Sequence, residues 1–123
     1  MRSLAMSLSN HQQGAADCAA TIRTLNDAFR RNPTAGRVML TAGVQALPES
    51  ERLKLLAAVM TFNDFNAGND PYNEHDFGAL DRGDVSYFWK IDYYDRDFEM
   101  GSPDPADPHV TRRVLTIMRA DEY

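Results

Sequence analysis

The most constraining feature of the sequence is the stretch of residues 85–95, in which two sets of side chains alternate. A period of two is typical of a β-strand, because successive side chains of a strand point to opposite faces of the sheet. One set is apolar or aromatic: Val85, Tyr87, Trp89, Ile91 and Tyr93. The other set contains two further aromatic residues, Phe88 and Tyr94. A strand with apolar side chains on both faces belongs inside a sheet, so we expect this strand to be central and covered by helices on one side.

Two further stretches predict neighbouring strands. Residues 76–80 form a short strand that a turn at Asp81-Arg82-Gly83-Asp84 joins to the long strand. Gly83 favours a hairpin, because glycine adopts the positive φ that a tight turn requires. We therefore interpret the Arg-Gly-Asp triplet as turn chemistry rather than as an adhesion motif. Residues 110–119 alternate again and predict the last strand, which follows a stiff, proline-rich connection at residues 101–108.

Apolar residues spaced three and four apart predict two helices. In residues 15–31 these are Ile22, Leu25 and Phe29, and Asn32-Pro33 ends the helix because proline disfavours the helical conformation of the residue before it. The second helix, residues 48–62, has Pro48 at its start and glutamates in its first turn. Its expected buried stripe is Leu53, Leu56, Ala57 and Met60. Residues 37–42, between the helices, alternate and predict a short strand.

These elements predict an α+β fold, in which two helices pack on one face of a mostly antiparallel sheet of about four strands, in the order α-β-α-β-β-β. The length of 123 residues is that of one domain. Residues 1–14 are polar and show no period, so we expect them to form a flexible tail. Residues 15–123 are then a single α+β domain.

Composition places the protein among cytoplasmic globular proteins. Hydrophobic residues make up 43% of the chain and charged residues 25%, and no apolar run approaches the ~20 residues that a membrane span needs. Serines interrupt the first eight residues before a signal-peptide core can form. The single cysteine, Cys18, has no internal disulfide partner, as in a reducing compartment.

Negative charge is concentrated in residues 63–109, which contain twelve acidic and three basic residues. A surface of this kind repels the phosphates of nucleic acids and attracts basic proteins. We therefore expect a basic protein partner, and neither direct nucleic-acid binding nor membrane binding. An alternative is that the acidic residues only keep the protein soluble. A homodimer is left open by the sequence.

The best candidate for chemistry is His75, which lies between Glu74 and Asp76. A histidine beside a carboxylate suits general acid–base catalysis, and Asp92 and Lys90 lie on the strand expected to pair nearby. His75 and the carboxylates of Glu74 or Asp76, Asp70 and Asp92 are also donors of the kind that a Mn, Fe or Zn site uses. In such a site Lys90 would stabilise developing negative charge. Adjacent residues of an extended segment point to opposite faces, however, so they would not all converge on one ion. The alternative interpretation is structural: these side chains tie the loop to the sheet through hydrogen bonds to backbone groups.

Several motifs together resemble a known family. They are Leu25-Asn26-Asp27, residues 36–44, Asn69-Asp70-Pro71, residues 74–78, residues 88–95, residues 102–105 and residues 111–118. The chain resembles a family of short bacterial proteins that is catalogued only as a domain of unknown function. The resemblance extends from about Ile22 to Tyr123 and implies no activity, substrate or cofactor. Because small proteins of this kind often lie on plasmids and prophages, it implies by association an accessory or anti-defence role.

Two functional hypotheses follow. The first is a non-catalytic binding or inhibitory protein, which presents acidic loops and exposed aromatic rings to a basic partner. Its predicted contact residues are Asp70, Tyr72, Glu74, Asp76, Asp92, Tyr94, Asp95 and Asp104, with Tyr87, Trp89 and Tyr93 among the exposed rings. The second is a small metal-dependent hydrolase or nucleic-acid-processing enzyme, with His75, Glu74, Lys90 and Asp92 as its candidate catalytic residues. The first hypothesis is preferred, and it requires no metal or other cofactor.

Overall fold

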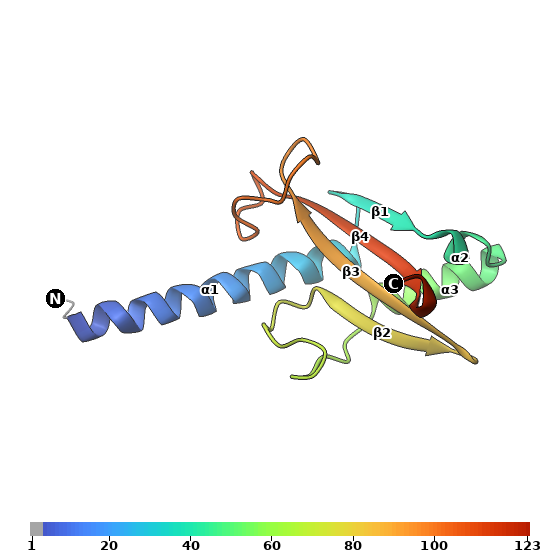
Figure 1. Cartoon of the computed structure of the whole chain (residues 1–123), viewed down its shortest axis with the longest axis horizontal. Coiled ribbons are helices and arrows are strands. Elements are labelled where there is room, and N and C mark those ends of the chain that lie inside the picture. Colours follow the sequence, from blue (N-terminus) through green and yellow to red (C-terminus); the bar gives the residue numbers. More distant parts are fainter. Residues whose placement is uncertain (1–3) are drawn as a thin grey trace.

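The computed structural model describes the backbone of residues 4–123 and the side chains of residues 18–123. In chain order its elements are α1 (Leu4–Arg31), β1 (Arg37–Leu40), α2 (Ala42–Gln45), α3 (Glu49–Met60), β2 (Phe77–Arg82), β3 (Val85–Tyr94), β4 (Arg112–Arg119) and the short 3-10 helix η1 (Ala120–Glu122). Apart from the single turns α2 and η1, this is the predicted order α-β-α-β-β-β (Figure 1). The predicted α+β class is confirmed.

Four strands form one sheet in the spatial order β1-β4-β3-β2. β3 pairs antiparallel with β2 and β4, whereas β1 pairs parallel with β4. The sheet is therefore mixed and mostly antiparallel, and β3 is an inner strand as its two-sided pattern predicted. The predicted hairpin is also present: Arg82 pairs with Val85, and Gly83 between them has a φ of 62°.

The main helices α1 and α3 pack on one face of the sheet, where the core lies. Trp89 of β3 is fully buried in a cluster that includes Phe29 of α1 and Leu55 of α3. Phe62, just after α3, meets the Trp89 ring edge-on, with 5.4 Å between the ring centroids. Alternation along β3 sends the side chains between these core residues to the opposite face of the sheet, which we call the open face because neither α1 nor α3 covers it.

The expected buried stripe of α3 was wrong in phase. Leu55 and Val59 are fully buried, whereas Leu53 is 57% exposed. The physical reason is that residues 55–60 are all apolar, so their periodicity does not determine which side of the helix faces the sheet. Packing against Trp89 and Phe62 determines it instead.

Helix α1 starts at Leu4, well before the start expected at residue 15. The side chains of residues 1–17 lie outside the described part of the chain, so the flexibility expected of residues 1–14 stays a prediction. In the described helices, no segment combines the length and the apolar character needed to cross a bilayer.

Strand β1 is shorter than expected, because the chain leaves the sheet at Thr41 and forms α2. The η1 residue Glu122 holds this turn. Its carboxylate accepts hydrogen bonds from the Thr41 hydroxyl (2.7 Å), the Gly43 N–H (2.8 Å) and the Arg119 N–H (2.9 Å). The last residues of the chain therefore fasten the segment between β1 and α3 to the end of β4.

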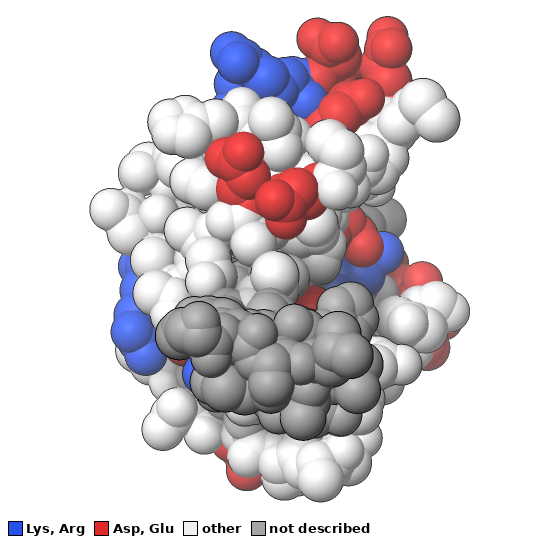
Figure 2. All heavy atoms as spheres, turned by 90° about the vertical axis from the view of Figure 1, so that its left-hand side faces the viewer, with Lys and Arg blue, Asp and Glu red and all other residues white. Residues whose placement is uncertain are grey.

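Charged side chains are unevenly distributed over the surface. The loop that joins β3 to β4 (the β3–β4 loop, residues 95–111) contains five acidic residues, Asp95, Asp97, Glu99, Asp104 and Asp107. Figure 2 shows carboxylates gathered at the top of the molecule, where Figure 1 places this loop. The acidic character predicted for the second half of the chain is thus visible at the end of β3 that this loop follows.

Candidate functional site

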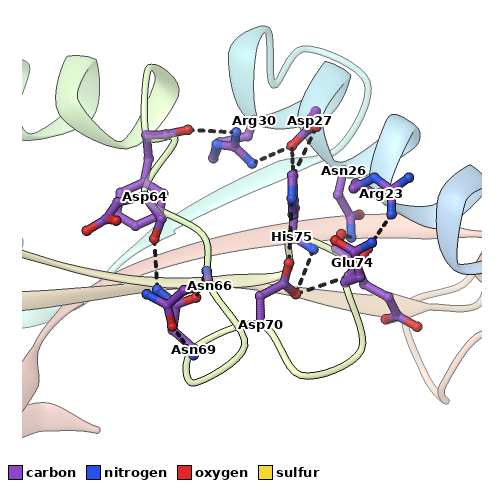
Figure 3. A network of polar contacts seen from close by, with 12 residues as sticks. Arg23, Asn26, Asp27, Arg30, Asp64, Asn66, Asn69, Asp70, Glu74 and His75 are labelled. Atoms are coloured by element: carbon purple, nitrogen blue, oxygen red, sulfur yellow. Dashed lines mark hydrogen bonds and ion pairs between the residues drawn. The ribbon is translucent and has the colours of Figure 1, made fainter.

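Polar side chains along one face of α1 hold the loop between α3 and β2 (the α3–β2 loop, residues 61–76). They are spaced three and four residues apart, which places them on one side of a helix. Arg23 donates to the Asn73 carbonyl (2.9 Å), Asn26 to the Glu74 carbonyl (3.0 Å) and Arg30 to the Phe62 carbonyl (3.0 Å). Figure 3 shows these side chains reaching from the helix to the loop. The helix thereby supplies partners for carbonyl groups of a segment that has no regular structure.

His75 lies in the middle of these contacts. Its Nδ1 is 2.9 Å from Asp27 Oδ1 on α1, and its Nε2 is 3.5 Å from Asp70 Oδ2 (Figure 3). One face of the imidazole is stacked on Phe65, with ring centroids 3.6 Å apart. Because both ring nitrogens face carboxylates and one ring face is covered, His75 links the loop to α1.

Asp70 shapes the loop from within. It is only 7% exposed, and its Oδ1 accepts the backbone N–H groups of Glu74 (3.0 Å) and His75 (3.1 Å). These bonds hold a backbone in which Asn73 and His75 have positive φ angles of 57° and 56°, a conformation that residues other than glycine rarely adopt. The Asp70 carboxylate thus points inward, to the loop that it organises, and its predicted contact with a partner stays a prediction.

Asn26 is the residue at which four parts of the fold meet. It is fully buried, and its Nδ2 donates to the Glu74 carbonyl and to the Tyr93 hydroxyl oxygen (2.8 Å). Its Oδ1 accepts a hydrogen bond from Arg113 Nε (2.7 Å). One amide thus connects α1, the α3–β2 loop, β3 and β4. Sequence reasoning did not identify this role, because the partners are up to 87 residues away along the chain.

Arg30 is a fully buried cation beside the core. Its Nη1 is 3.1 Å from Asp27 Oδ1, and its guanidinium carbon lies 4.9 Å from the centre of the Trp89 ring and 5.3 Å from that of Phe65. Burial lowers the pKa of Arg30, and the neighbouring Asp27 carboxylate opposes that shift. Arg30 lies in the last turn of α1, where a cation also complements the helix dipole.

Two carboxylates at the end of the loop are electrostatically strained. Burial raises the pKa of Glu74, and the negative charge of Asp76 raises it further. Burial likewise raises the pKa of Asp76. The Tyr93 hydroxyl donates to Glu74 Oε1 (3.3 Å) and partly offsets the effect on that residue. Both carboxylates therefore hold a proton more tightly in the folded protein than they would in water.

The candidate catalytic residues do not form one cleft. His75 packs on the helix-covered side of the sheet, against Asp27 and Phe65. Lys90 and Asp92 lie on the open face, where their side chains form an ion pair (3.0 Å). Hydrogen bonding with Asp92 raises the pKa of Lys90. The suggested constellation fails because Lys90 and Asp92 alternate with the core residues of β3, so the sheet separates them from the histidine.

The structural interpretation of this region is supported instead, with one difference: the polar side chains tie the loop mainly to α1 rather than to the sheet. Among the side chains that the structure describes, no three from His, Cys, Asp and Glu are grouped so that they could hold a metal ion.

The open face contains a groove of about 480 Å³. Residues of β1, β3 and β4 form its floor, and the tip of the β3–β4 loop forms one wall. Its lining includes Arg37, Met39, Asp92, Tyr94, Phe98 and Thr116. We call this depression the sheet groove.

The wall of the sheet groove is a closed turn. The Asp95 N–H donates to the Met100 carbonyl (2.8 Å), and the Phe98 N–H donates to the Asp95 carbonyl (3.1 Å). The carboxylate of Asp95 accepts the N–H groups of Asp97 (3.2 Å) and Glu99 (3.0 Å). Phe98 is thereby held with a φ of 58°, which is unusual for an aromatic residue. Sequence reasoning assigned Asp95 to a partner but did not identify Phe98.

Comparison with known proteins assigns the chain to a family. The model of a family described as protein of unknown function (DUF3768) matches residues 40–122. The chain belongs to this family. No curated protein and no solved structure matches it. The resemblance predicted from the sequence is confirmed, although it was expected to begin near Ile22, and the α1 residues that hold the loop precede the matched range of the DUF3768 model.

In this DUF3768 protein the predicted contact residues divide into two groups. Asp70, Tyr72, Glu74 and Asp76 belong to the α3–β2 loop, whereas Asp92, Tyr94, Asp95 and Asp104 belong to β3 or to the β3–β4 loop. Figure 1 shows the α3–β2 loop below α1 and the β3–β4 loop above it. In the first group Tyr72 is 77% exposed and Glu74 and Asp76 are half-buried; in the second Asp104 is exposed and the other three are half-buried.

The expectation of exposed aromatic rings along β3 was wrong for its inward face. Tyr87 and Trp89 are buried, and Tyr93 is largely enclosed by its contacts with Asn26 and with the Arg113 guanidinium, 5.2 Å from the ring centre. These rings form the core because the helices cover that face. Tyr94, on the open face, is half-buried and lines the sheet groove of this DUF3768 member.

Proposed function

We propose that this DUF3768 protein is a non-catalytic docking protein that binds a basic segment of a protein partner along the sheet groove and the β3–β4 loop. One observation carries the proposal: the acidic β3–β4 loop borders a partly apolar groove on the face of the sheet that neither main helix covers. Apolar surface favours association when it leaves water, and carboxylates beside it select a basic partner and accelerate its approach.

The groove offers adaptable apolar contacts. Met39 at its edge is 53% exposed, and Met100 at the end of the turn is 71% exposed. Methionine is flexible and polarisable, so it packs against side chains of different shapes. Tyr94 and Phe98 add aromatic surface of the kind that is enriched at protein interfaces.

The charges around the groove favour a basic protein over a nucleic acid. Asp97, Glu99 and Asp104 are exposed, and none of them forms an ion pair with another side chain in the described part of the chain. Their charge repels a phosphate backbone and attracts lysine and arginine. The form of this function that we favour is inhibitory: an accessory protein, associated with mobile elements, that blocks the basic surface of a nucleic-acid-binding protein, as anti-defence proteins do.

A charge-reversal pair tests the proposal. Glu99→Lys changes the wall of the groove, whereas Asp84→Lys makes the same charge change at the β2–β3 turn, at the other end of β3. The partner that copurifies with the wild type at low salt is identified and its binding to each purified variant is measured. We expect a basic protein whose affinity falls at least tenfold with Glu99→Lys, because the reversal replaces an attractive contact by a repulsive one. A tenfold change corresponds to about 1.4 kcal/mol. With Asp84→Lys the affinity should change less than threefold.

Two outcomes would contradict the proposal. Equal loss of affinity in both variants would mean that only net charge matters and that the groove is not the docking surface. A specific partner that binds both variants as tightly as the wild type would place the interaction elsewhere on the molecule.

A further inference from the structure

An arginine of the chain itself lies on an aromatic ring of the sheet groove. The guanidinium carbon of Arg37, on the edge strand β1, is 3.8 Å from the centre of the Phe98 ring. This is the geometry of a cation–π contact, in which the positive charge is attracted to the electron-rich face of the ring. Tyr94 adds a second ring, with its centroid 6.4 Å from that of Phe98.

The chain holds Phe98 in this place against its conformational preference. Its φ of 58° is unfavourable for a bulky side chain, and such a conformation persists only where surrounding bonds enforce it. Here the enforcing bonds are those of the closed turn, from the Asp95 N–H to the Met100 carbonyl and from the Glu99 N–H to the Asp95 carboxylate. A strained aromatic residue at a loop tip, rather than in the core, indicates a surface shaped for contact.

Acidic residues flank this ring in the chain. Asp97 and Glu99 are its direct neighbours and are exposed, and Asp92, which is paired with Lys90, lines the same groove. An aromatic face with acidic groups around it is complementary to a guanidinium, whose flat surface stacks on the ring while its N–H groups donate to carboxylates. Lysine matches the charge but not the flat shape.

We propose that Phe98 is the arginine-binding seat of the docking surface, and that Arg37 occupies it until an arginine of a basic partner segment displaces it. The inference rests on the proposed function and specifies its ligand. Among the described residues, the Arg37 side chain makes no hydrogen bond or ion pair that would hold it on the ring, and its backbone pairing with Val114 does not depend on the position of the guanidinium. The side chain can therefore move away without disturbing β1.

The test uses the full-length protein and two fluorescein-labelled probes, a peptide of alternating arginine and glycine and the corresponding lysine peptide, with binding followed by fluorescence anisotropy at low salt. The wild type is expected to prefer the arginine peptide. Phe98→Leu should weaken arginine-peptide binding about two- to fivefold, the equivalent of one exposed cation–π contact, and should change lysine-peptide binding less. Thermal unfolding of Phe98→Leu confirms that the variant is folded.

Removal of Arg37, the side chain that competes for the Phe98 ring, should change peptide affinity in the opposite direction. Arg37→Gln should strengthen arginine-peptide binding about two- to fivefold, and should have a smaller effect when Phe98 is already leucine. Arg96→Gln is the matched control, because it removes the same charge from an exposed position of the β3–β4 loop, which contains Phe98. Equal strengthening by Arg37→Gln and Arg96→Gln would show a general charge effect and overturn the inference.

The failure of this inference differs from the failure of the proposed function. If both peptides bind the wild type and Glu99→Lys weakens them while Phe98→Leu does not, the basic-partner function stands and the arginine seat is wrong. If neither peptide binds the wild type at low salt, the proposed function and the arginine seat fall together.

Discussion

Replacement of Asn26 by alanine tests whether the buried amide holds the fold together. The change removes three hydrogen bonds, to the Glu74 carbonyl, the Tyr93 hydroxyl and Arg113 Nε. Arg113 is almost fully buried, so water cannot replace the partner of its Nε, whereas the other two groups are partly accessible. A buried polar group left without a partner costs about 1–3 kcal/mol, and more when it is charged. We therefore expect the free energy of unfolding to fall by about 2–4 kcal/mol.

Urea unfolding followed by tryptophan fluorescence measures this change, because the chain has one tryptophan and Trp89 is fully buried. With an m value of about 2 kcal/mol/M, a loss of about 3 kcal/mol lowers the urea midpoint by roughly 1.5 M.

Thr24→Ala is the matched control for Asn26→Ala. Thr24 is exposed on the same helix and donates its hydroxyl only to the Ala20 carbonyl one turn before, so its replacement should change stability by less than about 0.5 kcal/mol. The reasoning is refuted if Asn26→Ala is as mild as Thr24→Ala. It is also refuted if Asn26→Ala destabilises strongly while Arg113→Met on the wild-type background has no effect.

Three further predictions concern single groups. Asp76→Asn should stabilise the protein at neutral pH. Because burial raises the pKa of Asp76, the folded state binds the proton more tightly than the unfolded state, and wild-type stability falls as pH rises above the ordinary pKa of 3.8. The urea midpoints of the two proteins should therefore converge in acid. Glu122→Gln should destabilise the protein at neutral pH, because hydrogen bonds from Thr41 and from the Arg119 and Gly43 N–H groups lower the pKa of Glu122. The stabilisation by the charged carboxylate is present above the ordinary pKa of 4.5 and disappears as pH falls below it. Thermal unfolding of both proteins between pH 3 and pH 7 measures this difference. Gly78→Ala should cost about 1–3 kcal/mol and shift the tryptophan emission, because the added methyl would overlap the Trp89 indole nitrogen and lie 2.8 Å from Phe62 Cε1; unchanged emission and stability would contradict the packing described here.

The fold could be predicted where local pattern and tertiary environment agree. The alternation in β3 has one solution, since a strand with apolar residues on both faces is stable only between two other strands, and Gly83 adopts the turn conformation that few other residues tolerate. In helix α3 the local pattern is not sufficient. Its residues 55–60 are apolar on all sides, so the buried side was decided by contacts with Phe62 and Trp89 that no local period contains.

The candidate site was less predictable because its decisive contacts are long-range. Composition correctly indicated where acidic residues are concentrated, but it did not distinguish carboxylates that organise their own loop, such as Asp70 and Asp95, from those that point to solvent, such as Asp97. The reactive pattern around His75 was equally ambiguous, because the carboxylate nearest its ring, Asp27, lies 48 residues earlier on α1. The residues adjacent to His75 in the sequence suggested catalysis, whereas its neighbours in space show that it links the α3–β2 loop to α1.

The two sides of the sheet differ in how their polar groups are used, and this asymmetry explains why we propose docking on only one of them. On the helix-covered side, Asn26, Arg30 and His75 use their polar groups within the fold, so a partner that bound there would have to break buried hydrogen bonds before it made new ones. On the open face, the groove residue Met39 is exposed, and the exposed carboxylates of Asp97 and Glu99 form no hydrogen bond or ion pair with another described residue. Association there costs little reorganisation, because the closed turn around Phe98 already holds the loop in one conformation. A rigid locked side and a preformed open side are consistent with a protein whose activity is to bind.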